Sequence, residues 1–329
     1  MDYKPLGRTG LTVSVAGLGC GGNSRLGLGQ GKSEDDAVEL VRAALDEGVT
    51  YFDTAEAYGT EHILGRAFSP AEWDRIVVST KSRILRNGER LSAADVVANL
   101  EQSLRQLRRE RVDVFLFHGI APAHYDYTRE VLAPALLAEQ RKGKIGHLGL
   151  SETGPGDPDQ TMLQRALDDP IWEVMMLAFH MMNQGARRDI FPRSRTQGVA
   201  TLLMFVVRNI FSRPGLLAET IRKLADEGQV PKELAESDHP LDFLIHEGGA
   251  SSLIDAAYRF ARHEPGADVV LFGTSDIAHL RTNVRSIAAP PLPAADVARL
   301  YDLFGHLRRV GLDLPDRVQA QAAQAAGRS

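Results

Sequence analysis

Short apolar runs alternate with amphipathic stretches along nearly the whole chain. Eight such runs, each six to eight residues long, span 13–19, 49–54, 75–81, 112–118, 144–151, 172–179, 199–205 and 268–275. They lack the alternation of apolar and polar positions that marks a half-exposed strand, and this is typical of parallel strands covered on both faces. We therefore predict eight buried strands.

The stretches between these runs repeat apolar residues at helical spacing. Residues 33–48 begin with a serine suited to cap a helix and place Leu40, Val41 and Ala44 on one stripe, and residues 92–107 follow the same pattern. Repeated strand–helix units predict a parallel sheet, and a count of eight favours closure into a (β/α)8 TIM barrel. A nine-strand open sheet is the alternative.

Segments outside this repeat complete the predicted organisation. Turn signals at Gly7 and Gly10 indicate an N-terminal β-hairpin over about residues 1–12, and residues 290–311 indicate an extra C-terminal helix. Residues 206–252 form the longest section without a strand, so we expect a long loop or insertion after strand seven that could act as a lid. Residues 312–329 are expected to form a C-terminal tail whose last part, residues 319–329, is frayed. With no linker or repeat, we interpret residues 1–329 as a single domain.

Four polar side chains lie at or just beyond the ends of three consecutive predicted strands. Asp53 closes the second run, Tyr58 follows on the next loop, Lys81 closes the third run and His118 closes the fourth. In a parallel barrel the carboxyl ends of the strands share one face, so these side chains are expected to converge. Each alone has an ordinary structural explanation, and it is their joint placement that indicates a catalytic site.

These four residue types suit one kind of chemistry. A phenol has a pKa of about 10 and is a weak acid at neutral pH unless its anion is stabilised. An ammonium group can stabilise the anion, and a buried ammonium keeps its charge when a carboxylate pairs with it. An imidazole can orient a carbonyl oxygen near the phenol. The set predicts proton donation to a carbonyl oxygen with hydride supplied by a cofactor. It contains no activated nucleophile and no metal-ligand spacing, so no metal is expected.

Six stretches resemble the aldo-keto reductase superfamily in order and spacing: PLGRTGLTVSVAGLG, FDTAEAYG, STK, FH, GKIGHLGLS and GTSDIAHLRTN. The resemblance implies a barrel that reduces aldehydes or ketones, or oxidises alcohols, and binds NAD(P)H extended without a Rossmann fold. It implies that Tyr58 is the general acid, Lys81 lowers its pKa, Asp53 pairs with Lys81, and His118 orients the substrate. The last stretch is most similar to the branch containing potassium-channel β-subunits and bacterial relatives.

The resemblance also implies where the cofactor binds. Ser151 matches a serine that hydrogen-bonds the nicotinamide carboxamide, and the adenosine phosphates are expected along residues 273–283. The expected cofactor contacts are Gly19, Cys20, Asp53, Ser151, Glu152, Met176, Met204, Phe205, Arg208, Gly273, Thr274, Ser275, His279 and Asn283.

Several of these positions depart from the family pattern around the nicotinamide. Glu152 replaces an asparagine and Met176 replaces a glutamine. Met204 occupies a position where an aromatic residue is expected to stack on the nicotinamide, so Phe205 or Phe179 would have to serve. Each lost hydrogen bond would cost about 1 kcal/mol of binding free energy.

NADPH is the expected cofactor, with NADH as the alternative. His279 replaces a glutamine in the phosphate loop, and no lysine or arginine stands at Thr274, where the family often places one. The 2′-phosphate of NADPH would then have to contact one of four arginines: Arg208, Arg213, Arg281 or Arg285.

Composition and charge narrow the remaining possibilities. With 329 residues, 43% of them hydrophobic, and a net charge of −5, the chain is typical of a globular protein without affinity for nucleic acid or anionic membranes. A single cysteine excludes an internal disulfide and fits a reducing compartment. No apolar segment resembles a signal peptide or is long enough to span a membrane. We expect a cytoplasmic protein acting on a small carbonyl or alcohol, with its oligomeric state open.

Two other functions compete with a barrel reductase. The stretch GLGCGG at residues 17–22 satisfies G-x-G-x-x-G, but a Rossmann unit needs the third glycine to open a helix, and the first predicted helix begins only near Ser33. The stronger rival is a cofactor-binding regulatory or redox-sensing protein with little turnover, because the nicotinamide pocket is altered.

Overall fold

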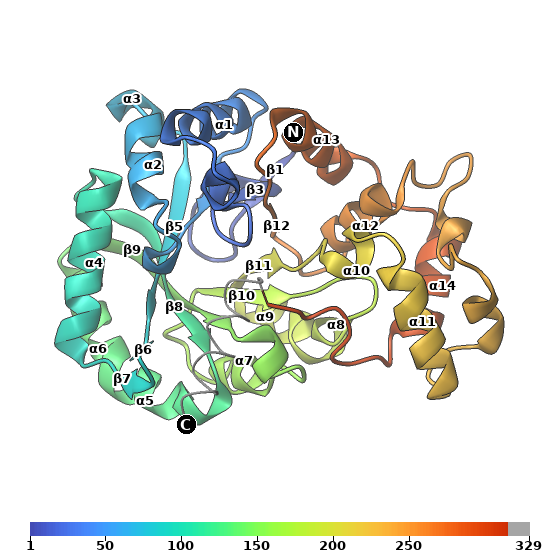
Figure 1. The fold of residues 1–329 in the computed structure, drawn as a ribbon. Helices are drawn as coiled ribbons and strands as arrows, with labels where there is room; N and C mark the ends of the chain where they lie inside the picture. Colours follow the sequence, from blue (N-terminus) through green and yellow to red (C-terminus); the bar gives the residue numbers. More distant parts are fainter. Residues whose placement is uncertain (315–329) are drawn as a thin grey trace.

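Eight parallel strands close into a barrel in the computed structural model, which describes residues 1–314 (Figure 1). In barrel order the strands are β3 (Ala16–Gly19), β4 (Tyr51–Asp53), β5 (Val77–Arg83), β8 (Val112–Ile120), β9 (Ile145–Glu152), β10 (Val174–Ala178), β11 (Ala200–Met204) and β12 (Val269–Phe272). Spatial order follows chain order, and β12 pairs with β3. This confirms the predicted (β/α)8 barrel and excludes the open sheet.

The N-terminal hairpin is longer than predicted. Strand β1 (Tyr3–Pro5) pairs antiparallel with β2 (Thr12–Ser14), from Tyr3 opposite Ser14 to Pro5 opposite Thr12. Val13 and Ser14, assigned to the first barrel strand from the sequence, therefore belong to the hairpin. The barrel strand begins at Ala16, where Ser14 Oγ donates a hydrogen bond to the carbonyl oxygen of Ala16 at 2.7 Å.

Helices surround the barrel and begin where polar caps predict. Ser33 and Ser92 cap α1 (Glu34–Asp46) and α4 (Ala93–Leu107), each with a reciprocal carboxylate three residues later. Apart from the helices within residues 206–252, the other helices between barrel strands are α2 (Glu61–Ala67), α3 (Pro70–Trp73), α5 (Tyr125–Tyr127), α6 (Ala133–Arg141), α7 (Thr161–Ala166), α8 (Ala186–Asp189), α9 (Phe191–Gln197) and α12 (Leu253–Arg262). After β12 come α13 (Ile277–Ala288) and α14 (Ala294–Phe304), the predicted extra C-terminal helix.

Short turns and one small hairpin complete the described chain. Outside residues 206–252 the 3₁₀ turns are η1 (Arg25–Gln30), η2 (Glu56–Tyr58), η3 (Pro122–His124) and η5 (Gly154–Gly156), and a π-helical turn, η4, covers Thr128–Leu132. Strands β6 (Leu85–Arg86) and β7 (Glu89–Arg90) form a hairpin after β5 that the sequence pattern did not predict. No helix among residues 1–314 combines the length and apolar character needed to cross a membrane. The predicted frayed tail lies outside the described residues from 315 onward.

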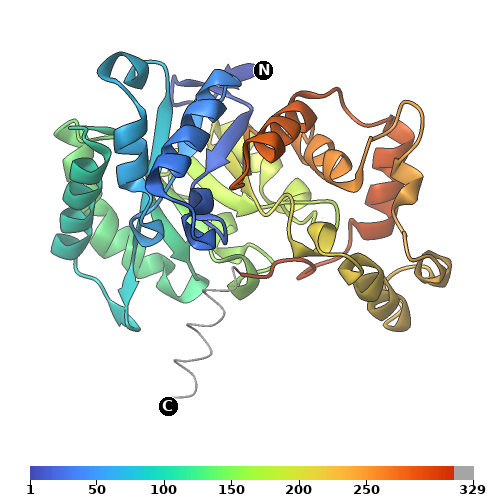
Figure 2. The same ribbon diagram turned by 45° about the horizontal axis from the view of Figure 1, so that its top comes forward.

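Residues 206–252, expected to be a long loop or insertion, are part helix and part loop. They contain α10 (Asn209–Ser212), α11 (Leu216–Asp226), η6 (Lys232–Glu236) and η7 (Asp242–Leu244). Two hydrogen bonds connect the segment to the α14 region. His246 Nε2 lies 2.9 Å from a carboxylate oxygen of Asp296, and His306 Nε2 lies 2.8 Å from the Gln229 carbonyl oxygen. In Figure 2, α11 and α14 lie together at one side of the barrel. The expected action as a lid stays a prediction.

Side chains of the barrel strands alternate between the interior and the helical layer. The interior holds one apolar cluster that includes Tyr51, Val77, Val114, Leu116, Val174, Met176, Ala200, Leu202 and Val269. Continuing this alternation toward the carboxyl ends brings Asp53, Lys81, His118, Ser151 and Met204 to the open end of the barrel. The fold therefore positions these side chains by strand register, and we call this open end the mouth.

Gly149 on β9 has no side chain, and this leaves space for the side chains of the interior cluster. We expect Gly149→Ala to lower the free energy of unfolding by about 2 kcal/mol. An added Cβ would lie 2.1 Å from the Val174 carbonyl oxygen and 2.5 Å from Leu116 Cδ2. Urea unfolding followed by circular dichroism measures the change. Gly19→Ala is the control, because its Cβ would meet no atom nearer than 3.4 Å. Equal stability of the two variants would contradict this account of Gly149.

Candidate active site

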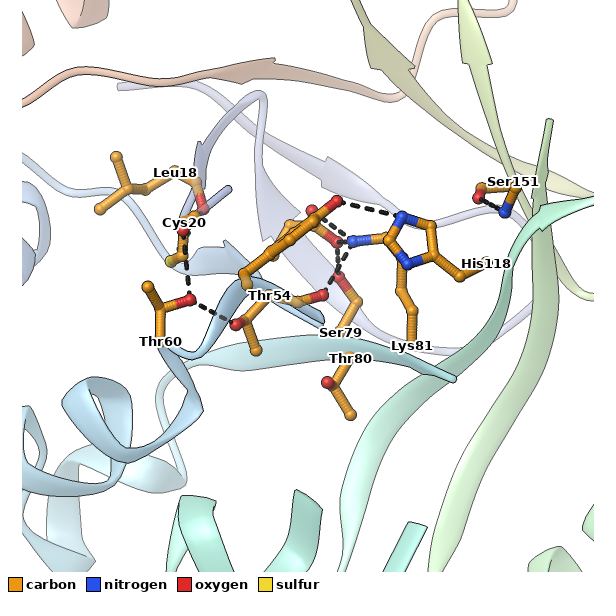
Figure 3. A network of polar contacts seen from close by, with 12 residues as sticks. Leu18, Cys20, Thr54, Thr60, Ser79, Thr80, Lys81, His118 and Ser151 are labelled. Carbon is orange, nitrogen blue, oxygen red and sulfur yellow. Dashed lines mark hydrogen bonds and ion pairs between the residues drawn. The ribbon is translucent and has the colours of Figure 1, made fainter. Parts of the chain in front are cut away.

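A buried ion pair joins β4 and β5 at the mouth. Lys81 Nζ lies 2.7 Å from both carboxylate oxygens of Asp53 and 2.8 Å from the Thr54 carbonyl oxygen. Ser79 Oγ donates to Asp53 Oδ1 at 2.6 Å (Figure 3). The side chain of Lys81 is fully buried, and that of Asp53 is 6% exposed. The two groups therefore pair closely, and neighbouring hydrogen bonds fill their remaining donor and acceptor positions.

Tyr58 and His118 meet beside this ion pair. Tyr58 Oη and His118 Nε2 are 3.4 Å apart, and their rings pack edge to face with centroids separated by 5.4 Å. Lys81 Nζ lies 4.9 Å from the centroid of the Tyr58 ring. The structure thus brings together the four side chains that the sequence placed at strand ends.

Burial dominates the protonation of these groups. It raises the pKa of Tyr58, while the ammonium group of Lys81 acts in the opposite direction. Burial also lowers the pKa of His118 to about 3, aided by the positive charges of Lys81 and Arg83. For Lys81, burial lowers the pKa, but the charge of Asp53 and the contact with Tyr58 outweigh it, so the net pKa is raised. Lys81 is therefore charged and His118 is neutral near pH 7. Lys81 does lower the pKa of Tyr58, as expected, but this effect is smaller than the increase caused by burial.

The turn that carries Tyr58 is fixed by residues that the sequence analysis missed. Thr54 Oγ1 and Thr60 Oγ1 are 2.9 Å apart, and Thr60 Oγ1 donates to the Cys20 carbonyl oxygen at 3.1 Å. Arg25 Nε donates to the Tyr58 carbonyl oxygen at 2.7 Å. Thr54 lies in the FDTAEAYG stretch and Thr60 follows it directly, which was a usable signal, whereas the chain position of Arg25 gave none.

Gly19 and Cys20 form the wall of the mouth at the end of β3. A Cβ on Gly273 would lie 3.5 Å from the Gly19 carbonyl oxygen, so the backbones of the two glycines are neighbours. Cys20 is fully buried, and burial raises the pKa of its thiol, as does the charge of Asp53. The thiol is therefore protonated and is not an activated nucleophile.

Ser151 and Glu152 end β9 but lie on different faces. Ser151 Oγ accepts a hydrogen bond from the Gly119 backbone N–H at 2.8 Å, which leaves its proton available for a ligand. Glu152 Oε1 accepts from the Ala178 N–H at 2.6 Å and from Gln160 Nε2 at 3.3 Å. This engages one oxygen of Glu152 with β10 and the start of α7. Contact with the carboxamide by either residue stays a prediction.

A methionine, Met204, stands at the mouth where an aromatic residue was expected. Met204 packs against the interior cluster, of which Met176 is a member. Phe179 is fully buried and stacks on Phe260, with ring centroids 5.7 Å apart and planes 9° apart, so the suggestion that Phe179 stacks on the nicotinamide is wrong. Phe205 has a left-handed backbone, with φ of 66°, and a Cβ on Gly154 would lie 2.9 Å from its ring. Stacking by Phe205 stays a prediction.

Two of the four arginines considered for the 2′-phosphate of NADPH form ion pairs. Arg208 donates to the carboxylate of Asp313 at 3.0 Å and also to its carbonyl oxygen, and its Cζ lies 4.4 Å from the Phe205 ring centroid. Arg281 pairs with Glu47 at 2.9 Å. Phosphate binding would have to compete with these pairs, and the role predicted for Arg208 stays a prediction.

The loop expected to hold the phosphates connects β12 to α13. Thr274 Oγ1 accepts from the Asp276 N–H at 3.1 Å, and Asp276 caps α13 by accepting from the His279 N–H at 2.9 Å. Ser275 Oγ donates to Gln30 Oε1. Asn283 lies four residues beyond His279 and so on the same helix face. Gln30, from the segment after β3, was missed because nothing in the sequence places it here.

This arrangement can donate a proton in a water-poor site. It combines a protonated phenol, a neutral imidazole and a buried cation held by a carboxylate. Within residues 1–314 no group of three or more His, Cys, Asp or Glu side chains is arranged to hold a metal ion. A carbonyl oxygen placed between Tyr58 and His118 could accept both a hydrogen bond and a proton.

Comparisons with known proteins agree on one family. The model of the Aldo/keto reductase family matches residues 17–303. Aldo-keto reductase YhdN of Bacillus subtilis (strain 168) is 26% identical over 293 residues, which cover 83% of this chain and 85% of that protein. L-galactose dehydrogenase of Arabidopsis thaliana is 29% identical over 208 residues, 61% of this chain and 64% of that protein.

Solved structures share the barrel. Two structures from Pseudomonas aeruginosa that are assigned to the aldo-keto reductases match with TM-scores of 0.60 and 0.63. Both matches cover 87% of this chain and 94% of the neighbour, at 24% and 22% identity, so they support the fold alone.

Glu152 makes stability depend on pH, and Glu152→Gln should remove this dependence. Burial raises the pKa of Glu152 to about 8. Below pH 4 the carboxyl is protonated in both folded and unfolded chains. Between about pH 4.5 and 8 only the unfolded chain releases the proton, which favours unfolding. The variant should therefore gain stability over the wild type as pH rises from 5 to 8, by about 1 kcal/mol or more.

Urea unfolding at pH 5 and pH 8 measures this gain. Glutamine can keep the acceptor that Ala178 N–H uses in the native chain. Glu233→Gln, at an exposed position in η6, is the control and should change stability equally at both pH values. A stability difference between Glu152→Gln and wild type that is the same at both pH values would refute the linkage.

Proposed function

The chain belongs to the aldo/keto reductase family, whose members are oxidoreductases acting on carbonyl substrates, and we propose that it is an NADPH-dependent reductase of aldehydes or ketones. The reverse oxidation of alcohols would use the same site. The observation that carries the proposal is the 3.4 Å approach of Tyr58 Oη to His118 Nε2 beside the buried Lys81–Asp53 pair.

Tyr58 is the proposed proton donor to the carbonyl oxygen. Burial keeps the phenol protonated, so the proton is present when the substrate arrives. As the proton leaves, negative charge develops on Tyr58 Oη, and the nearby Lys81 ammonium stabilises that charge in surroundings of low dielectric constant. Asp53 holds Lys81 in place and keeps it ionised.

His118 is proposed to orient the substrate. An imidazole with a pKa of about 3 stays neutral and carries one N–H near pH 7. That N–H can donate to the carbonyl oxygen without adding a positive charge beside Lys81. Orientation of this kind fixes the carbonyl at hydrogen-bond distance from the phenol.

The residues present fit a nicotinamide cofactor, which when bound supplies the hydride for the carbonyl carbon. Ser151 would hold the carboxamide, because its hydroxyl accepts from Gly119 N–H and retains a proton to donate. The neighbouring backbones of Gly19 and Gly273 carry no side chain that would come between them and the cofactor. Ser275 and Asn283 would contact the adenosine phosphates. A preference for NADPH over NADH is part of the proposal.

Replacement of the phenol tests the chemistry. Tyr58→Phe should lower kcat at least about 100-fold because the proton donor is lost, while the dissociation constant for NADPH changes less than about threefold. Turnover is measured by NADPH absorbance across a panel of aldehydes and ketones, and binding by fluorescence titration.

Tyr3→Phe is the matched control, since this exposed tyrosine bonds the Gly48 carbonyl far from the mouth. Full activity of Tyr58→Phe would exclude Tyr58 as the donor. NADPH binding without turnover of any carbonyl by the wild type would instead favour a regulatory protein.

A further inference from the structure

The segment after β3, residues 21–32, connects the Tyr58 turn to the loop after β12. At one end, Arg25 Nε donates to the Tyr58 carbonyl oxygen at 2.7 Å. At the other, Lys32 Nζ donates to the Ser275 carbonyl oxygen, and Gln30 Oε1 accepts from Ser275 Oγ. Residues 21–32 therefore bridge the two places where the proposed function puts proton transfer and cofactor phosphates.

The segment contacts both the backbone and the ring of Tyr58. A Cβ on Gly21 would lie 2.5 Å from Tyr58 Cε2, so the backbone of Gly21 lies directly against the aromatic ring. The peptide group after Tyr58 leads into Gly59, which has a left-handed φ of 65°. A Cβ on Gly59 would lie 3.1 Å from Arg25 Nη2. The guanidinium of Arg25 thus covers this peptide and holds its carbonyl oxygen.

Arg25 itself is fixed in an unfavourable backbone conformation. Arg25 and Leu26 have φ values of 45° and 60°, in a region that costs non-glycine residues on the order of 1 kcal/mol each. Leu26 is buried, with 1% of its surface exposed, and the N–H groups of Gly27 and Gly29 both donate to the Ser24 carbonyl oxygen, at 2.8 and 3.0 Å. These contacts hold the turn in the shape that aims Arg25 at Tyr58.

We propose that Arg25 is a positioning residue for the proton donor. It acts through the Tyr58 backbone and not on the substrate. The turn η2 is only three residues long, and the bond from Arg25 restrains the peptide that follows Tyr58. Without it the Tyr58 hydroxyl would sample positions away from His118 and Lys81, and small displacements of a reacting group lower the rate steeply. The inference rests on the proposed role of Tyr58.

Two variants separate position from charge. Arg25→Gln places an N–H donor at the same number of bonds from Cα as Nε but without the charge, and Arg25→Met removes the donor. We expect kcat of Arg25→Met to fall about tenfold, with KM for the carbonyl and the dissociation constant for NADPH within about twofold of wild type. Arg25→Gln should recover most of the loss. The midpoint of the pH dependence of kcat should stay unchanged in both.

A stability control excludes a general loosening of the fold. Arg8→Met removes an arginine that donates to the carbonyl oxygens of Gln197, Pro170 and Trp172, near the amino ends of the strands and away from the mouth. It should lower stability without lowering kcat.

The outcomes decide between the two proposals. If the wild type turns over a carbonyl substrate and Arg25→Met has the same kcat, the positioning role is overturned and the proposed function stands. The same holds if Arg25→Met and Arg25→Gln lose kcat equally. Absence of turnover in the wild type would overturn the proposed function and this role with it.

Discussion

The buried ion pair between Lys81 and Asp53 is the constraint on which the site depends. A fully buried ammonium is stable only if its charge is neutralised and its hydrogen-bonding capacity is filled. Both Asp53 oxygens and the Thr54 carbonyl meet that requirement, and Ser79 adds a bond to the carboxylate. Because these groups come from the ends of adjacent strands, the pair also fixes β4 against β5 at the mouth.

The pair sets the electrostatics of its neighbours. A permanent positive charge in a site without bulk water disfavours a second cation, so it adds to burial in keeping His118 neutral. The same charge favours the anion of Tyr58, although burial still leaves the phenol protonated at rest. The proposed proton donor is thus protonated at rest, and the ammonium would stabilise its anion once an acceptor takes the proton.

Much of the fold and of the central site could be predicted because both follow from strand periodicity. Eight apolar runs separated by helical stretches are enough to indicate a closed parallel barrel, and polar residues at strand ends must then meet at one face. The contacts of Phe179, Glu152 and Arg208 could not be predicted this way. Phe179 lies one residue beyond β10 and turns into the helical layer against Phe260, while Arg208 pairs with Asp313 more than one hundred residues away.

The sequence by itself determined the barrel, its strand order and the identity of the four residues at the mouth, because periodicity and strand ends are local properties of the chain. Tertiary structure alone decided which side chains surround them. Arg25 reaches Tyr58 and Gln30 reaches Ser275 only because the segment after β3 folds back through buried Leu26 and two left-handed residues. Such contacts depend on loop conformation and packing, and no residue spacing encodes them.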